Sequence, residues 1–241
     1  MASSPFIPFG AQHIIAMAIV IGTAVATALA LRAWGTPRAN RTMRWLLAIA
    51  CVAYVGAELS WQVHTGMAQV HEALPLHLCD ISLLIAPVAL LTANRTAYEL
   101  LYFWGIGGTL QALATPTLFS GFPAPICLMF FLGHGLILAS ALHATLVMRL
   151  RAVGRSVVRV WLITIAYALL ILPLNFALGT NYLFIAHKPL TPSLLDLLGP
   201  WPWYLLALQP IVVAVLLLCY LPFFALDRRW RKAAGAPGRA R

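Results

Sequence analysis

The residues of this chain that are best suited to chemistry are a cysteine and several histidines in apolar surroundings. The segment Leu74-Pro75-Leu76-His77-Leu78-Cys79-Asp80 places a thiol next to two ionisable side chains. Pro75 fits the first turn of a helix, and the positive end of that helix would favour an anion such as a thiolate. Because a thiolate is a strong nucleophile, Cys79 is the candidate for covalent catalysis.

A cysteine nucleophile needs a base, and His77 is poorly placed for that role because side chains two residues apart on a helix point about 200° apart. His134, between Gly133 and Gly135, is the better candidate. Counting 1.5 Å per helical residue places Cys79 about 8 Å and His134 about 12 Å below the outer ends of their helices. These depths are similar, so we predict that the two side chains face each other at contact distance or through one water.

Other polar residues at bilayer depth are candidates for positioning the substrate, because polar groups in lipid are costly and mark functional sites. Asp80 or Glu58 could orient His134, and Gln111 or backbone N–H groups could hold an oxyanion. The sequence does not rank these helpers. The full supporting set is Glu58, Gln62, His77, Asp80, Gln111, Asn175, Asn181 and Tyr182.

The elements that carry these residues must be membrane helices. Of the 241 residues, 62% are hydrophobic and 9% are charged, and the mean hydropathy is +0.88. A soluble domain would be about half apolar and about a quarter charged. We predict an all-α membrane protein with seven spans of about 20 residues each, which leaves no room for a soluble catalytic domain. The spans run from Gln12 to Leu31, Trp45 to Val63, Leu74 to Thr92, Tyr98 to Leu118, Ile126 to Met148, Val160 to Leu178 and Trp203 to Phe224.

The basic residues predict the orientation of this bundle. Of the 16 Lys and Arg residues, 15 lie on one side, and only Lys188 lies on the other. Because positive charge stays in the cytoplasm, the N-terminus is predicted outside and the C-terminus inside. We expect one transmembrane domain, residues 1–227, followed by a basic, disordered tail, residues 228–241. In a bacterium the membrane would be the cytoplasmic (inner) one.

No cofactor, metal or nucleic acid is expected. The chain has four cysteines, Cys51, Cys79, Cys127 and Cys219. Their spacing does not match a metal site, and the basic residues lie in short loops rather than on one soluble face. A small-solute transporter or permease and a non-catalytic membrane binding protein are the alternatives to an enzyme. A retinal protein is excluded because Lys188 and Lys232 lie outside the late helices, whereas a bis-His haem protein using His77 and His134 stays open.

Four separated motifs carry a resemblance to a known family. In chain order they are Leu74 to Asp80, Gln111-Ala112-Leu113-Ala114-Thr115-Pro116, Phe130-Phe131-Leu132-Gly133-His134-Gly135, and Asn181-Tyr182 with Lys188-Pro189 and Pro200-Trp201-Pro202-Trp203-Tyr204. With these motifs the chain resembles the YwaF-like family of integral membrane proteins, related to the animal transmembrane protein 164 acyltransferases. The resemblance extends from the second predicted helix to the seventh.

The resemblance implies acyl transfer between membrane phospholipids and lysophospholipids, with a membrane cysteine and a membrane histidine as the working pair. The family's cysteine matches Cys79 and its histidine matches His134. The predicted topology adds an expectation about the acyl donor. Acyl-CoA cannot easily cross about 30 Å of hydrocarbon to reach a cysteine under the outer face. We therefore expect transacylation between lipids that does not depend on CoA.

Overall fold

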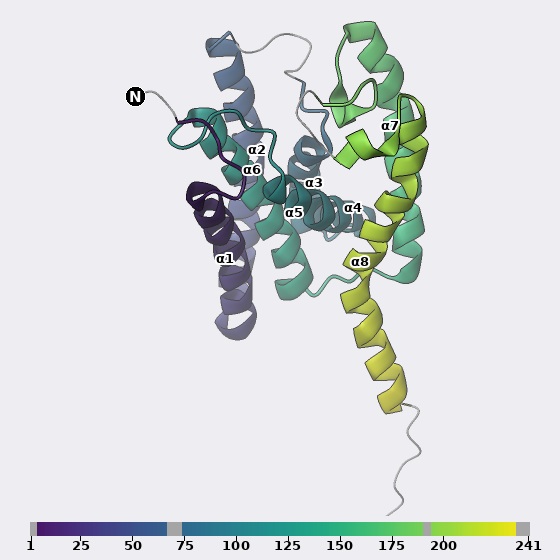
Figure 1. Cartoon of the computed structure of the whole chain (residues 1–241). Helices are drawn as coiled ribbons and strands as arrows, with labels where there is room; N and C mark the ends of the chain where they lie inside the picture. Colours follow the sequence, from purple (N-terminus) through teal and green to yellow (C-terminus); the bar gives the residue numbers. More distant parts are fainter. Residues whose placement is uncertain (1–3, 67–73, 190–193, 235–241) are drawn as a thin grey trace, which may run out of the picture.

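The computed structural model describes residues 4–66, 74–189 and 194–234, and these residues fold almost entirely into helices (Figure 1). Within these ranges, β structure is limited to an isolated bridge between Pro5 and Ser120. The α-helices are α1 (Ala11–Trp34), α2 (Pro37–His64), α3 (Leu78–Thr92), α4 (Arg95–Tyr102), α5 (Thr109–Ala114), α6 (Pro125–Leu142), α7 (Gly154–Leu178) and α8 (Trp203–Ala234). Two π-helical turns, η1 (Phe103–Gly108) and η2 (His143–Val147), follow α4 and α6, and two 3-10 turns, η3 (Tyr182–Phe184) and η4 (Leu194–Leu198), lie between α7 and α8.

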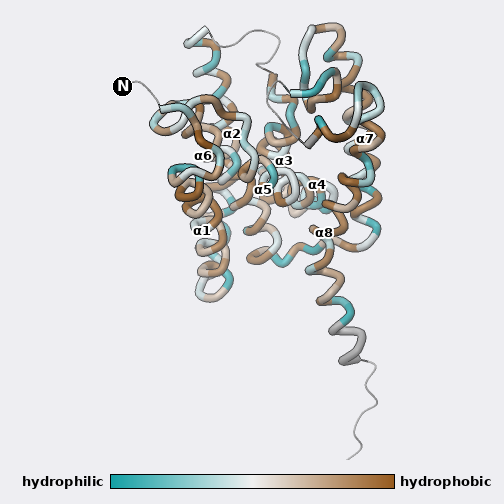
Figure 2. The backbone as a smooth tube through the Cα atoms, in the orientation of Figure 1, coloured by the Kyte–Doolittle hydropathy of each residue, from teal (hydrophilic) through white to brown (hydrophobic). Residues whose placement is uncertain are grey.

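Five helical segments are long and apolar enough to cross a membrane, namely α1, α2, α6 with η2, α7, and α8 as far as Arg228. Large apolar side chains such as Ile15, Leu170 and Leu206 are each more than half exposed on their outer surfaces. Figure 2 shows these helices as largely hydrophobic along their length. Such surfaces suit lipid rather than water. The chain is therefore an all-α, multi-pass membrane protein, as predicted.

The other two predicted spans are also helical, but they differ from ordinary membrane helices. The third, α3, has 15 residues, which is short of the roughly 20 that cross a bilayer core. The fourth consists of α4, η1 and α5, which follow one another directly from Arg95 to Ala114. Its centre is a π-helical turn, a feature that a hydrophobic pattern does not predict. A count of seven spans requires both of these central segments to cross the membrane.

The helix α3 begins later than predicted, because its own first turn is capped by side chains. Asp80 Oδ2 accepts a hydrogen bond from the His77 backbone N–H at 3.0 Å, which starts the helix at Leu78 rather than Leu74. Pro75 therefore precedes the helix instead of lying in its first turn. The Leu76 carbonyl in this preceding stretch accepts a hydrogen bond from the Tyr167 hydroxyl of α7 at 2.8 Å.

The centre of the bundle is formed by α3, α4 and η1, which pack against α6. Tyr98, Leu101 and Phe103 are almost fully buried there and belong to the largest hydrophobic cluster. The turn η1 and the helix α6 approach closely at Gly105 of η1, where an added Cβ would lie 2.9 Å from the Ile137 side chain of α6. A small residue in this position is what permits the close helix packing.

A buried carboxylate joins α4 to α7. Glu99 is fully buried, and its Oε1 accepts hydrogen bonds from Arg95 Nε at 2.9 Å and from Ser156 Oγ at 2.7 Å. Its Oε2 accepts a bond from Arg159 Nη1 at 2.9 Å. Both carboxylate oxygens of Glu99 thus have a cationic or hydroxyl partner. Such partners are the condition for burying a charge without a large desolvation penalty.

The ends of the helices define two ends of the bundle. The end of α2, the starts of α3 and α6, and the end of α7 lie toward the upper end in Figure 1. At the other end, α8 continues through Ala234. The first part of the predicted tail is therefore helical, and residues 235–241 lie outside the described residues.

Candidate active site

A pocket of about 380 Å³ lies between α2, α3 and α6. The predicted site residues that line it are Glu58, Gln62, His77, Cys79, Asp80 and His134. Other side chains complete the wall, among them Tyr54 and Trp61 of α2, Leu83 of α3 and Met129, Phe130 and Ile137 of α6. One pocket thus brings together a thiol, two imidazoles and two carboxyl groups from three separate elements.

Cys79 is the second residue of α3 and is partly buried. The first turn of a helix has backbone N–H groups without partners inside the helix. The backbone N–H groups of this turn are therefore candidates for stabilising negative charge on a bound group beside Cys79. The capping bond from the His77 N–H to Asp80 fixes this turn, so it also fixes the position of Cys79 in the pocket wall.

His134 is held in one tautomer by a hydrogen bond within its own helix. Its Nδ1 lies 2.8 Å from the Phe130 carbonyl oxygen. Because a carbonyl only accepts, we assign the proton to Nδ1, and Nε2 of the neutral ring then carries a lone pair. The Phe130 ring stacks on the imidazole with the ring centroids 4.2 Å apart. This arrangement leaves Nε2 as the basic atom of the ring.

The glycine before His134 allows α2 to approach α6 closely. The Tyr54 ring lies against Gly133, where an added Cβ would be 2.7 Å from Tyr54 Cζ. The Tyr54 hydroxyl donates a hydrogen bond to the Met129 carbonyl at 2.8 Å, one turn earlier on α6. These contacts fix the face of α2 that carries Glu58 against the face of α6 that carries His134.

The two carboxyl groups of the pocket have different surroundings. Asp80 caps α3 by accepting from the His77 N–H, whereas Glu58 lies one turn after Tyr54 on α2, within hydrogen-bonding reach of the Tyr54 side chain. Both carboxyl groups therefore have partners within the protein. Both would repel a neighbouring thiolate when ionised. This pocket therefore favours a neutral Cys79 thiol over a resting thiolate.

Three predicted supporting residues lie outside the pocket wall and organise the segment behind it. Asn175 is buried at the end of α7, and its Oδ1 accepts hydrogen bonds from Thr180 Oγ1 and the Tyr182 N–H, both at 2.8 Å. Asn181 Oδ1 accepts from the His187 N–H at 3.1 Å. The Tyr182 hydroxyl accepts from the Leu74 N–H at 3.1 Å.

The segment after α7, residues 181–187, contacts His77, which lines the pocket. The Tyr182 ring meets the His77 ring edge to face with the ring centroids 5.4 Å apart, and Phe184 lies on the same imidazole at 5.7 Å. His77 is thus held between the pocket and the segment after α7. Gln111 has a different place, because it is exposed on α5 and is not part of the pocket wall.

The depth predicted for Cys79 assumed a helix that begins at Leu74, and the structure differs there. The stretch before Cys79 is not helical, so Cys79 lies only one residue after the start of α3, whereas His134 is the tenth residue of α6. Both residues nevertheless line one pocket. Contact between the two side chains, directly or through one water, stays a prediction.

Tyr54 is one of the pocket residues that sequence reasoning missed. It precedes Glu58 by four residues and therefore lies on the same face of α2. Its aromatic ring was indistinguishable from an ordinary apolar side chain in the hydrophobic pattern. The glycine at position 133 was the available signal, because a glycine inside a membrane helix marks a place where another element approaches.

In the part of the chain that the structure describes, no group of three or more His, Cys, Asp or Glu residues could hold a metal ion.

These features define a multi-pass α-helical membrane protein with a cysteine- and histidine-containing pocket among its helices. The chain belongs to the TMEM164 family, whose family model matches residues 8–220, and the resemblance inferred from the four motifs is thereby confirmed. An uncharacterised protein of Treponema pallidum (strain Nichols) is 31% identical over 150 residues, which cover 62% of this chain and 62% of that relative. The match thus spans less than two thirds of the relative's length. No solved structure matches the chain.

Proposed function

We propose that this chain is a membrane-embedded acyltransferase that moves a fatty acyl group between a phospholipid and a lysophospholipid. Cys79 forms the acyl thioester, and His134 acts as the general base and acid. The observation that carries the proposal is that Cys79 and His134, from different helices, line one pocket in which His134 Nε2 is the basic ring atom. Membership of the TMEM164 family supports the same class of protein.

The first half-reaction transfers the acyl group to the enzyme. His134 Nε2 takes the proton of the Cys79 thiol while the sulfur attacks the ester carbonyl of the donor phospholipid. Collapse of the tetrahedral intermediate breaks the bond between the carbonyl carbon and the glycerol oxygen. The His134 imidazolium gives its proton to that oxygen, so a lysophospholipid leaves and the thioester remains.

The second half-reaction reverses the roles. His134 Nε2 takes the hydroxyl proton of an acceptor lysophospholipid, and the hydroxyl oxygen attacks the thioester carbonyl. The C–S bond breaks, and the sulfur recovers a proton from the imidazolium. Backbone N–H groups in the first turn of α3 are the candidates for stabilising the oxyanion in both steps.

The topology of the proposal has seven membrane spans, with the N-terminus outside and the C-terminus in the cytoplasm. The distribution of 15 of 16 basic residues to one side supports this orientation. The pocket then opens toward the outer leaflet of the inner membrane of a bacterium. Phospholipids of that leaflet are the acyl donors, and transfer needs no acyl-CoA.

Purified protein in liposomes with acyl-labelled phosphatidylcholine and an unlabelled lysophospholipid tests the proposal. Mass spectrometry should find label in the newly acylated phospholipid without added CoA. Cys79→Ala should abolish the transfer, and His134→Ala should lower its rate by roughly 10²- to 10⁴-fold, the usual contribution of a general base.

Cys219→Ala is the matched control, because Cys219 is also partly buried but is not part of the pocket wall. It should leave the transfer unchanged. Equal transfer by wild type and Cys79→Ala would reject the mechanism. A failure of the wild type to exchange acyl groups, together with facilitated passage of a small solute into the liposomes, would favour the transporter alternative.

A further inference from the structure

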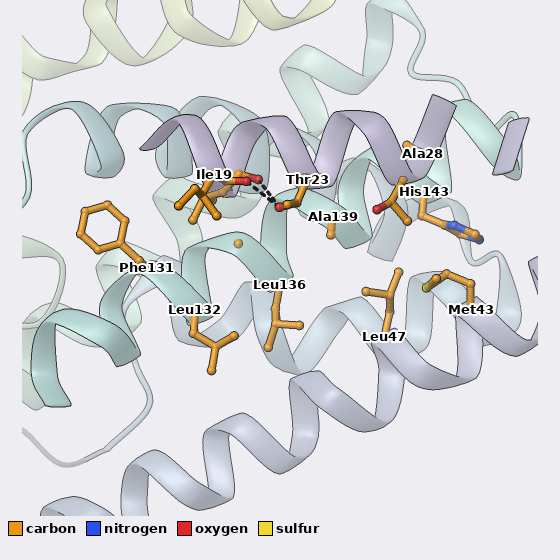
Figure 3. A pocket seen from close by; sticks show the side chains of 14 residues that line it. Ile19, Thr23, Ala28, Met43, Leu47, Phe131, Leu132, Leu136, Ala139 and His143 are labelled. Atoms are coloured by element: carbon orange, nitrogen blue, oxygen red, sulfur yellow. Dashed lines mark hydrogen bonds between the residues drawn. The ribbon is translucent and has the colours of Figure 1, made fainter. Parts of the chain in front are cut away.

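A second cavity lies on the other side of α6 from the candidate active site. It is a groove of about 430 Å³ between α1, α2 and α6. Figure 3 shows Ile19 and Thr23 of α1, Leu132 and Leu136 of α6 and Leu47 of α2 around it. The Thr23 hydroxyl is within hydrogen-bonding distance of the Ile19 and Val20 carbonyls, at 2.6 and 3.2 Å, so it presents little free polarity to the groove. The lining is therefore almost wholly apolar.

The groove is separate from the active-site pocket. Along the same face of α2, Leu47 borders the groove and Tyr54 borders the pocket. Cys51 lies between them and contacts Ser140 of α6, with 3.6 Å between Cys51 Sγ and Ser140 Oγ. The two cavities can therefore hold different molecules.

One polar side chain at the end of the groove lacks a partner. His143, which begins the π-helical turn η2, is 2% exposed, and its Nε2 has no hydrogen-bond partner among the described residues. In Figure 3 it lies at one end of the groove, near Met43 and Ala28. A buried polar atom without a partner is costly and calls for an explanation. A polar group of a ligand that occupies this end would supply the missing hydrogen bond.

The length of the groove suits one acyl chain of a membrane lipid. Its lining on α6 runs from Phe131 to His143, which at 1.5 Å per residue is about 18 Å. One leaflet of a bilayer core is about 15 Å thick. A chain that lies along the groove therefore extends from the middle of the bilayer to the end where His143 lies.

Several arginines lie just beyond the end of the groove that contains His143. Arg32 follows Ala28 by about one turn of α1, and Arg38 and Arg41 lie in the first two turns of α2. All three are exposed and take part in none of the ion pairs in the described chain. Trp34, which is 84% exposed, lies between them at a position typical of a membrane interface. Cations and an interfacial tryptophan at this level favour a negatively charged lipid headgroup.

We propose that this groove is a binding site for an anionic phospholipid of the leaflet on the basic side of the protein. One acyl chain lies between α1, α2 and α6, an ester or glycerol oxygen reaches His143 Nε2, and the phosphate lies against Arg32, Arg38 and Arg41. The positive end of the α2 dipole at the same turn adds to the attraction. This site is independent of acyl transfer at Cys79.

Native mass spectrometry of the full chain in detergent, titrated with dioleoyl phosphatidylglycerol or dioleoyl phosphatidylcholine, tests the proposal. Phosphatidylglycerol should bind the wild type at least tenfold more tightly. The double variant Arg38→Gln with Arg41→Gln should lose roughly tenfold or more in affinity for phosphatidylglycerol, because each cation near the surface contributes to holding an anionic lipid. The matched control, Arg155→Gln with Arg228→Gln, removes two exposed arginines of α7 and α8, helices that do not line the groove, and should bind normally.

The groove itself is tested by Ala139→Phe, which places a ring in its middle, against Leu128→Phe on the exposed surface of the same helix. Only Ala139→Phe should reduce phosphatidylglycerol binding. The proposal is overturned by equal binding of the two lipids, by equal effects of the two arginine pairs, or by normal binding to a folded Ala139→Phe variant.

A measurement on the wild type does not depend on how the variants fold. Phosphatidylglycerol with a photoactivatable diazirine in the middle of one acyl chain should label peptides that contain Ile19 to Ala28 or Leu132 to Ala139. Labelling of α7 and α8 in the same yield as these peptides would mean that the lipid contacts the whole surface, and it would overturn the proposal.

Discussion

His134 owes its chemical form to a bond inside its own helix rather than to a neighbouring carboxylate. The Phe130 carbonyl, 2.8 Å from Nδ1, keeps the proton on that atom, and Nε2 remains the basic one. Gly133, next in the chain before it, lets Tyr54 pack against α6. The tautomer of the imidazole and the close approach of α2 and α6 therefore depend on adjacent residues. The residue at position 133 should accordingly be more sensitive to substitution than the residue at position 135.

Gly133→Ala should destabilise the protein by about 1–3 kcal/mol, because the new Cβ would lie 2.7 Å from Tyr54 Cζ and would force the two helices apart. Gly135→Ala is the matched control on the other side of His134, where the Cβ would be 3.4 Å from Val20. Alanine favours a helix over glycine, so this control should be neutral or slightly stabilising. Thermal unfolding in detergent measures both, and equal losses would contradict the packing described for Tyr54.

At the scale of elements, sequence periodicity predicted where helices exist better than where they begin. Long apolar segments were placed well at one end: α1 begins within one residue of its predicted start, and α7 ends at its predicted residue, Leu178, although it begins six residues earlier, at Gly154. About 20 apolar residues in a row admit few alternatives. The start of α3 was wrong by four residues because a single side chain, Asp80, caps it. The π-helical turns depend on packing between helices, which a single sequence does not reveal.

The same limit applies to the site. The predicted residues of α2, α3 and α6 line one pocket, as is usual for polar groups that gather in a membrane cavity. Asn175 and Asn181 instead stabilise the segment behind His77, a role that their polarity alone could not distinguish from substrate binding. The groove beside His143 had no sequence signal, since it is formed by small and apolar residues.

The buried Glu99 provides a prediction about how α4 and α7 are held together. Glu99→Gln should cost about 1–3 kcal/mol, since it weakens charge-assisted hydrogen bonds to Arg95 and Arg159 at a fully buried position. The control is Asp227→Asn, whose partner Arg151 and own side chain are both 42% exposed. An exposed pair contributes less than about 1 kcal/mol. Chemical or thermal unfolding in detergent should separate the two variants, and similar values would contradict the structural role of Glu99.

At the scale of the whole molecule, the placement of the pocket relative to the membrane decides which lipids reach it. The pocket lies toward the end of the bundle where α2 ends and α6 begins, away from the arginines after α1 and α6. Because positive charge is expected on the cytoplasmic side, the pocket is predicted to lie on the outer side. In our proposals the two cavities face different leaflets, one for acyl exchange and one for an anionic lipid.

Labelling of an introduced cysteine tests this orientation. With the four native cysteines replaced by alanine, Ser3→Cys should react with a membrane-impermeant maleimide in intact cells or spheroplasts. A cysteine in place of Ala240 should react only after permeabilisation. The reverse pattern would place the pocket on the cytoplasmic side, where acyl-CoA could reach it, and would remove the argument for a CoA-independent reaction.

The acyl thioester on Cys79 is the most direct test of the central claim. Purified protein is incubated with acyl-labelled phosphatidylcholine without an acceptor, and the peptide that contains Cys79 is analysed by mass spectrometry before and after hydroxylamine. The account predicts an acyl adduct on Cys79 that hydroxylamine releases, that a lysophospholipid discharges, and that is much reduced in His134→Ala. Acyl transfer by the wild type with no adduct on Cys79, or with an adduct on another residue, would contradict it.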